Sequence, residues 1–295
     1  MENSSPGRSL KEEFRPSKFG LAYPDPDAFV RSQWHQPKWF YFIWRLFWFL
    51  WHIGWIIASG VYTRKNQARY PEEGAKWFIY FTNITLLLTT LTCTVDFLIV
   101  LYVSALRGGT VLDTTPWYVK LLWLMYNVIS SVNIVITVVY WAVGYHAGNT
   151  DVISVEAHTI NSAFIILNIL VTAMPIQILH CIYPMVYAAL YFLFNFIYIV
   201  AGGTDLQGRT VIYSSVDWNK PFPTAVVVTL GVLLAVPVGH VLVFAIYTLR
   251  VFLYSKVNSA SYSLRESCLR LTNRTVDVNN PHGNENIEMT NSAAV

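Results

Sequence analysis

The sequence predicts an all-α fold, an integral membrane bundle of about six transmembrane helices. Hydrophobic residues make up 54% of the 295 residues and charged residues only 13%, whereas about 25% of the residues of a typical soluble domain are charged. The apolar residues also form long runs, and a run of about 20 such residues can cross the hydrocarbon core of a bilayer as a helix. Composition and run length together therefore favour a membrane protein.

Six apolar runs are long enough to span a membrane. The fourth and fifth are separated only by the segment around Pro175, where proline disfavours helix, so a merged pair that leaves five spans is the alternative. The first run is too long and too aromatic for a cleaved signal peptide. The runs are Trp39–Val61, Trp77–Val103, Leu121–Val143, His158–Ile176, Ile178–Val200 and Ala225–Leu249.

An even number of spans puts both termini on one side of the membrane. Lysine and arginine near the span ends are slightly more frequent on the side of the termini, which favours cytoplasmic termini. We therefore expect a cytoplasmic N-terminal segment (1–37), a six-helix transmembrane domain (38–250) and a cytoplasmic tail (251–295). From about Asn258 the tail is rich in Asn, Ser, Thr and charged residues, a composition typical of disorder.

Charge and cysteine content exclude several classes of protein. The net charge of +3 is spread over the termini and loops, so we expect membrane lipids and no nucleic acid as partners. Three cysteines provide no disulfide framework. Two histidine pairs, His52 with His158 and His180 with His240, allow haem ligation as an alternative, but tryptophans crowd the first pair, and we expect no cofactor and no metal.

Two helices carry stripes of polar residues, and polar side chains within a membrane tend to face the interior of the bundle. On the second span the stripe covers roughly 80° of the helix surface and on the fourth roughly 120°, by helical periodicity. The two stripes are expected to face each other. The first comprises Thr82, Thr85, Thr89, Thr92 and Asp96, and the second comprises His158, Asn161, Ser162, Asn168 and Thr172.

Thr82 and His158 begin their spans on the same side, so they are expected at similar depth. Histidine is the usual base that activates a hydroxyl nucleophile near neutral pH, and Asn83 or Asn161 could donate to an oxyanion. Asp96 lies about 21 Å further along its helix, too far to orient His158. The alternative is structural, because threonines in apolar helices often bond to their own backbone.

Two other groups in the first span are expected to have structural roles. Arg45 is expected to extend its long side chain to the headgroups. The tryptophans at positions 44, 48, 51 and 55 are expected to pack against lipid or a neighbouring helix. The loop from Gly202 to Pro223 lies on the opposite side of the membrane from the termini. We expect it to cover the half of the bundle that holds Thr82 and His158.

Several segments taken together resemble the rolling stone family of membrane proteins. The landmarks lie between roughly residues 28 and 250, and their order and spacing make the match specific. They are Ser32-Gln33-Trp34, Lys76 to Asn83 (KWFIYFTN), His158 to Ser162 (HTINS), Pro175 to His180 (PIQILH), Tyr183-Pro184, Ala201 to Asp205 (AGGTD), Ile212-Tyr213, and Asp217-Trp218 with Pro221.

This resemblance implies two different functions. The rolling stone family is distantly similar to the androgen-induced membrane hydrolases, six-helix proteins that cleave fatty acid esters with a threonine and a histidine, which match Thr82 and His158 here. That similarity implies an intramembrane hydrolase of lipid esters. Rolling stone proteins themselves are associated with myoblast fusion, so the alternative is a non-enzymatic protein of cell fusion or adhesion. We expect the plasma membrane rather than the endoplasmic reticulum.

Overall fold

The structure is a computed structural model that describes residues 10–105, 112, 114–144, 152–220 and 224–279, with side chains up to residue 260. These residues form helices joined by turns and loops, with one isolated β-bridge between Ser32 and Thr172 and no β-strand. The predicted all-α fold is therefore confirmed. The chain divides into two compact units, Met1–Arg250 and Val251–Val295, and the description below concerns the first unit unless the tail is named.

Within the described part of the chain, six helices are long and apolar enough to cross a membrane, as predicted. The fourth span is one continuous helix that consists of three consecutive elements. The six are α2 (Lys38–Tyr62), α3 (Phe81–Ala105), α4 (Trp117–Val139), the series α5 (Val152–Val155), η6 (Glu156–Ile160) and α6 (Asn161–Val171), α7 (Ile182–Val200) and α8 (Thr224–Asn279). The shorter helices are α1 (Leu10–Glu13), η1 (Pro16–Phe19), η2 (Pro26–Phe29), η3 (Thr63–Gln67), η4 (Pro71–Ile79), η5 (Tyr140–Gly144) and η7 (Ile178–Cys181).

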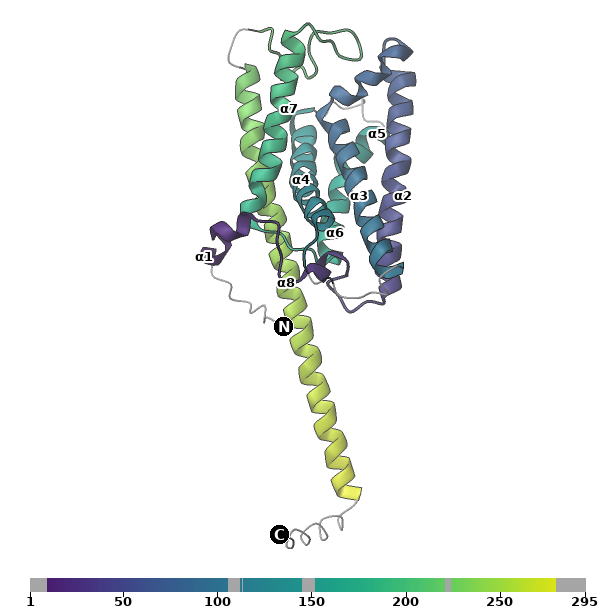
Figure 1. Cartoon of the computed structure of the whole chain (residues 1–295), viewed down its shortest axis with the longest axis vertical. Helices are drawn as coiled ribbons and strands as arrows, with labels where there is room; N and C mark the ends of the chain where they lie inside the picture. Colours follow the sequence, from purple (N-terminus) through teal and green to yellow (C-terminus); the bar gives the residue numbers. More distant parts are fainter. Residues whose placement is uncertain (1–9, 106–111, 113, 145–151, 221–223, 280–295) are drawn as a thin grey trace. The chain divides into compact units, whose positions relative to one another are not determined.

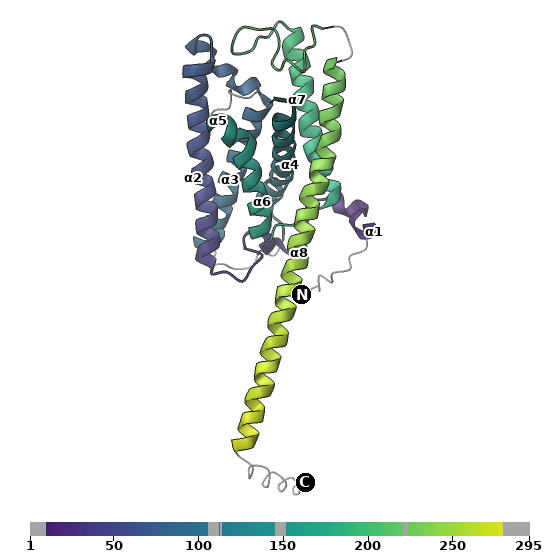
Figure 2. The same cartoon turned by 180° about the vertical axis from the view of Figure 1, so that it is seen from behind.

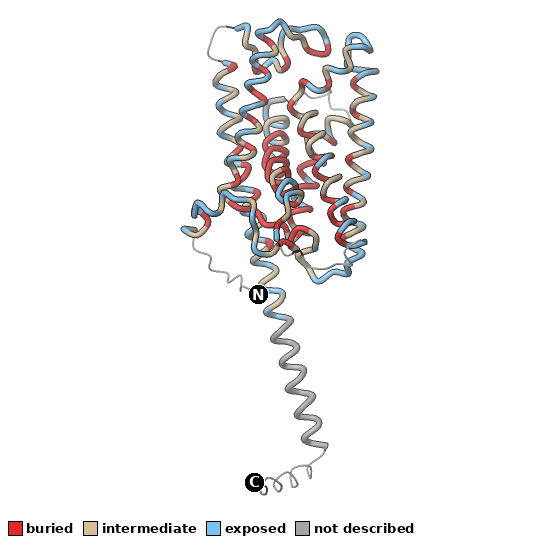
Figure 3. The backbone as a smooth tube through the Cα atoms, in the orientation of Figure 1, coloured by how far each residue is buried: buried red, intermediate tan, exposed pale blue. Residues whose placement is uncertain are grey.

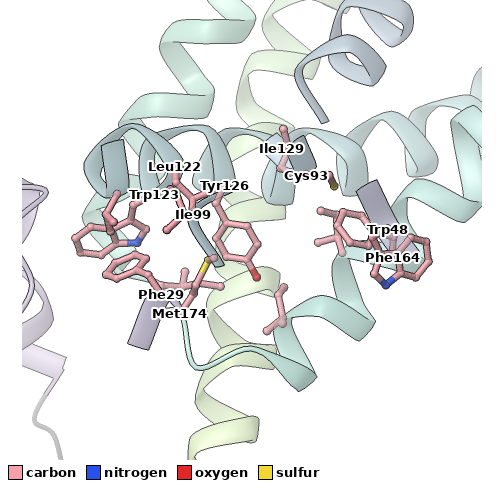
Figure 4. Close-up of a cluster of buried hydrophobic side chains, with 14 of the residues drawn as sticks. Phe29, Trp48, Cys93, Ile99, Leu122, Trp123, Tyr126, Ile129, Phe164 and Met174 are labelled. Atoms are coloured by element: carbon pink, nitrogen blue, oxygen red, sulfur yellow. The ribbon is translucent and has the colours of Figure 1, made fainter. Parts of the chain in front are cut away.

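The membrane helices run side by side, and α4 lies in the middle of the bundle (Figures 1 and 2). Figure 3 shows the buried residues concentrated along this helix. Trp123, Tyr126 and Ile129 of α4 join Phe164 of α6 and Trp48 of α2 in one apolar core (Figure 4). Burial of these large side chains against each other fixes the positions of the outer helices around α4.

The second span begins later than the sequence predicts. Trp77, the expected first residue, belongs to η4, and α3 begins at Phe81. The indole Nε1 of Trp77 donates a hydrogen bond of 2.9 Å to Ser59 Oγ on α2. This hydrogen bond holds η4 against the end of α2. The aromatic residues before Phe81 therefore cover the bundle and do not extend the second span.

The fourth and fifth spans are separate, so the five-span alternative is wrong. The fourth ends at Val171 rather than Ile176, and the chain from Thr172 to Gln177 is not helical. Pro175 disfavours helix there. The N-terminal segment also forms hydrogen bonds with the backbone of this stretch: Gln33 N donates to Val171 O (2.9 Å) and Ala173 N donates to Arg31 O (3.1 Å). Both the proline and the hydrogen bonds to the N-terminal segment therefore stabilise the break between the two spans.

The N-terminal segment packs into the same end of the bundle that α8 reaches at Arg250. Phe29 is fully buried and its ring lies 5.3 Å from that of Trp123. Arg250 donates to Ile169 O (2.8 Å) at the end of α6, beside the residues that pair with Arg31 and Gln33. The chain therefore enters and leaves the bundle at one end, as an even number of spans requires; we call this the terminal end and the other the distal end.

In the tail, α8 continues to Asn279, past Asn258, where composition predicts that disorder begins. The chain from residue 251 to 279 contains neither proline nor glycine, the two residues that most weaken a helix. Composition predicted the polar character of this segment, but the absence of helix breakers lets the helix of the sixth span continue. The last residues of the tail, 280–295, lie outside the described part.

Candidate functional site

Thr82 is the second residue of α3, at the distal end of the bundle. The backbone N–H of Phe81 donates to the hydroxyl of Tyr213, at 2.9 Å, and the same hydroxyl interacts with the Thr82 side chain. Burial raises the pKa of Tyr213, which keeps its hydroxyl neutral. A neutral phenol both accepts and donates hydrogen bonds, so Tyr213 fixes the start of α3 and orients the half-buried Thr82.

His158 lies in the π-helical turn η6, where Asn161 N bonds to Glu156 O, five residues earlier. Its imidazole stacks on the ring of Tyr140 with centroids 3.6 Å apart and an angle of 4° between the planes. The turn packs against both α3 and α4. The structure therefore brings the turn that carries His158 against the helix that carries Thr82, and the pairing of the two side chains stays a prediction. Isolated π turns are frequent at functional sites.

The two asparagines proposed as oxyanion donors each use their amide group locally. Asn83 Nδ2 donates to Trp77 O (2.9 Å) and so joins α3 to η4. Asn161 Nδ2 lies 3.4 Å from Ala157 O, and the residue is buried beside His52. An amide carries two donor hydrogens, so these bonds leave one hydrogen on each. Their role with an oxyanion stays a prediction.

The loop after α7 is fastened at the distal end, close to Thr82. Lys76 Nζ donates to Thr204 Oγ1 (2.7 Å) and to Asp205 O (3.0 Å). Arg209 forms an ion pair of 2.7 Å with the buried Asp205 carboxylate. Tyr213 of the same loop reaches the start of α3. The described part of this loop, up to Lys220, therefore covers the end of the helix that carries the proposed nucleophile.

Two of the four threonines in the α3 stripe bond to their own helix. Thr89, Thr92 and the neighbouring Thr90 donate to the carbonyl oxygens four residues earlier, at 2.7 to 2.9 Å. This is the pattern of the structural alternative. Thr89 also accepts a hydrogen bond of 3.1 Å from Asn133 on α4, so the stripe helps to pack the helices.

The expectation for Arg45 is wrong. Its side chain is 3% exposed and forms an ion pair of 2.7 Å with Asp96 on α3. The same guanidinium donates to Asn168 Oδ1 (2.7 Å), to Thr172 Oγ1 (3.0 Å) and to the Tyr41 hydroxyl. Arg45 therefore connects the predicted polar stripe of α3 with that of the fourth span. The sequence did contain a signal for this ion pair, because Arg45 and Asp96 lie on consecutive antiparallel spans at similar distances from the terminal ends of those spans.

The second histidine pair of the haem alternative, His180 and His240, has its ring nitrogens engaged by protein atoms. His240 Nδ1 lies 2.8 Å from Ser131 Oγ and its Nε2 lies 2.9 Å from Gln177 O. His180 has Asn127 Nδ2 at 3.2 Å and Gly20 O at 3.3 Å. Both ring nitrogens of each are thus engaged by protein atoms. His52 bonds to Trp48 O (2.7 Å) through Nδ1 and packs on Phe164.

The tryptophan stripe of α2 packs as expected. The ring of Trp48 lies 4.6 Å from that of Phe164 on α6, and Trp44, Trp51 and Trp55 contact one another or Trp48. Among the described residues no three His, Cys, Asp or Glu side chains are grouped to hold a metal ion.

Six membrane helices around a buried polar interior define a multipass integral membrane protein. The family model described as "Protein rolling stone" matches residues 5–269. This chain belongs to the rolling stone family. It is 31% identical over 262 residues to Protein rolling stone of Drosophila melanogaster, a match that covers 82% of this chain and 90% of the relative.

The match to the family model extends beyond residues 28–250, where the landmarks in the sequence lie, and includes parts of both terminal segments. No solved structure matches the chain.

Proposed function

We propose that this rolling stone family protein hydrolyses lipid esters within the membrane, with Thr82 as the nucleophile and His158 as the general base. The observation that supports this function best is the position of Thr82 in the first turn of α3. The first backbone N–H groups of a helix have no acceptor within the helix, and they carry the positive end of its dipole. An oxyanion formed next to Thr82 is stabilised there.

In the proposed reaction His158 takes the proton of the Thr82 hydroxyl, and the threonine oxygen attacks the ester carbonyl. The tetrahedral oxyanion is stabilised by the positive end of the α3 dipole and accepts a hydrogen bond from Asn83 or Asn161. It collapses to an acyl-threonine as His158 returns the proton to the leaving alcohol. Water, deprotonated by His158, then attacks the acyl group and releases the fatty acid and free Thr82.

The proposed substrate is a fatty acid ester that enters from the bilayer, so membrane lipids are the partners that this function requires. The loop that holds Tyr213 covers the end of α3, which supports a reaction shielded from bulk water. For the location we propose the plasma membrane in preference to the endoplasmic reticulum.

The test is the release of fatty acid from a panel of lipid esters by the purified full-length protein. We expect turnover by the wild type and its loss in Thr82→Ala and His158→Ala. The matched control is Thr92→Ala, because the Thr92 hydroxyl bonds to Leu88 O of its own helix (2.7 Å) and should not affect chemistry. The hydrolase proposal fails if the wild type cleaves no ester, or if the folded Thr82→Ala variant retains full turnover.

A non-enzymatic role in cell fusion or adhesion is the second candidate. It is favoured by the threonines of α3 that donate to their own helix, because packing alone accounts for those polar groups. A cell fusion assay separates the two candidates: Thr82→Ala rescues fusion in cells that lack the protein if the role is non-enzymatic, and fails to rescue if the role depends on hydrolysis.

A further inference from the structure

The first helices of the chain lie at the edge of the bundle and not within it. Both α1 and η1 project sideways from the terminal end in the two views (Figures 1 and 2). The helix η1 packs against η7, which directly precedes α7, and none of the residues of η1 is buried. We call residues 10–20, which comprise both helices, the N-terminal arm. Most of its described side chains lie outside the protein core.

The arm is attached to the lipid-facing end of α7. The hydroxyl of Tyr183, in the first turn of α7, donates a hydrogen bond of 2.6 Å to Phe19 O. Ile182 and Val186, on the same side of this helix, have exposed apolar side chains. Because α7 is one of the helices that can cross the membrane and Tyr183 lies near its start, the hydrogen bond places the arm where the fifth span meets the headgroups.

Aromatic and basic side chains are interleaved along the arm. The side chain of Phe14 is 57% exposed and that of Phe19 is 48% exposed. Exposed aromatic residues that are flanked by lysine and arginine are typical of segments that lie in the interface of a membrane. The basic residues are Lys11, Arg15 and Lys18, of which the first two are exposed and the third is half-buried.

The acidic residues of the arm do not cancel its accessible positive charge. Glu13 is buried, and Glu12 lies 3.8 Å from Arg15 in an ion pair whose two side chains are exposed. Such an exposed pair is weak, so Arg15 stays available to another anion. With Lys11 and Lys18, the accessible side of the arm carries three positive charges and one negative charge. This surface is complementary to a layer of phosphate groups.

We propose that the N-terminal arm is an interfacial anchor, which binds the phospholipid headgroup layer on the terminal side of the membrane. Phe14 and Phe19 insert at the boundary between the headgroups and the acyl chains. The basic side chains contact phosphate oxygens, while their apolar stems lie along the lipid. A second copy of the chain fits this surface less well, because the arms of two symmetry-related copies would meet with like charges.

The test places a reporter at position 14 of the full-length protein, with one chain per lipid nanodisc so that no second copy can cover the arm. The natural cysteines are replaced by alanine, and Phe14→Cys carries the fluorophore NBD. We expect phospholipids with brominated acyl chains to lower its emission at least about twofold. The same loss is expected for Leu190→Cys, whose exposed side chain lies within the fifth span. Gln207→Cys in the exposed distal loop is the matched control and should keep its emission. An emission at position 14 that brominated lipid leaves unchanged overturns the proposal.

If the cysteine-free protein does not fold, the wild type decides the matter. Nanodiscs that contain a phospholipid with a photoreactive diazirine at the top of its acyl chain are irradiated, and mass spectrometry locates the lipid adducts. Adducts within residues 11–20 support the anchor, and adducts confined to the six spans overturn it. The double variant Phe14→Ser with Phe19→Ser should reduce the adducts of the arm, while the hydrogen bond from Tyr183 remains, because Phe19 accepts it through its backbone oxygen.

Discussion

Arg45 on α2 and Asp96 on α3 form an ion pair of 2.7 Å in which both side chains are at least 96% buried, with 3% and 4% exposed. Burying two charges costs more than their attraction returns unless other groups complete the hydrogen bonding. Here Asn168 and Thr172 of the fourth span and its continuation accept hydrogen bonds from Arg45, while Arg45 Nε and Asp96 Oδ1 have no partner among the described residues. The ion pair and these two residues therefore connect three spans of the bundle.

Removal of one partner of this pair should be strongly destabilising. We expect Asp96→Leu to lower the free energy of unfolding by about 3–5 kcal/mol, because it leaves the Arg45 charge buried and uncompensated. The double variant Arg45→Met with Asp96→Leu should recover most of that loss, since no charge remains. Unfolding of the purified proteins in detergent measures both. A double variant no more stable than Asp96→Leu contradicts this account.

A second prediction concerns the close approach of α8 to α4 at Gly239. A Cβ atom there would lie 2.7 Å from Val135 Cγ2 and 3.2 Å from Ser131 O. Gly239→Ala should therefore destabilise the protein by about 1–3 kcal/mol through overpacking. In the same helix a Cβ at Gly231 meets nothing within 4 Å, so Gly231→Ala should stabilise by about 0.5–1 kcal/mol. Thermal unfolding compares the two, and equal effects contradict the contact.

The nucleophile assigned to Thr82 leads to a third prediction. Thr82→Ser keeps the hydroxyl and should retain hydrolysis, whereas Thr82→Val keeps the shape of the side chain and should lose at least about 100-fold in kcat. Fatty acid release under saturating ester measures both variants. If the valine variant turns over as fast as the serine variant, Thr82 has no covalent role.

The number of spans, their order and the packing of the tryptophans were predictable because apolar length and helical periodicity are local properties of the sequence. The periodicity of a single helix does not predict the role of Arg45, because its partner, the Asp96 carboxylate, lies on the next span. The π turn at Glu156–Ile160 depends on the backbone of the folded helix and leaves no compositional signal. Hydropathy places Trp77 in the second span because an apolar residue in a short helix that covers the bundle has the same composition signal as one in a span.

Tyr80, the residue between η4 and α3, leads to a prediction about alkaline pH. Its hydroxyl lies 3.5 Å from Leu206 N, and its ring packs edge-on to Tyr213 at 5.9 Å. Burial raises the pKa of Tyr80 from 10.0 to about 12. The folded state therefore holds the phenolic proton more tightly than the unfolded state. The stability that Tyr80 contributes is complete below about pH 10 and is lost as the pH rises towards 12.

Replacement of Tyr80 by Phe removes this titration. Between pH 9 and 11, we expect the Tm of Tyr80→Phe to fall less steeply than that of the wild type, while the two curves run parallel below pH 9. The matched control is Tyr102→Phe, because Tyr102 is 41% exposed and lies near the terminal end of α3. It should follow the wild-type curve throughout. If the Tm of Tyr80→Phe and the Tm of the wild type fall with the same slope above pH 9, the ionisation of Tyr80 in the distal loop region does not contribute to alkaline unfolding.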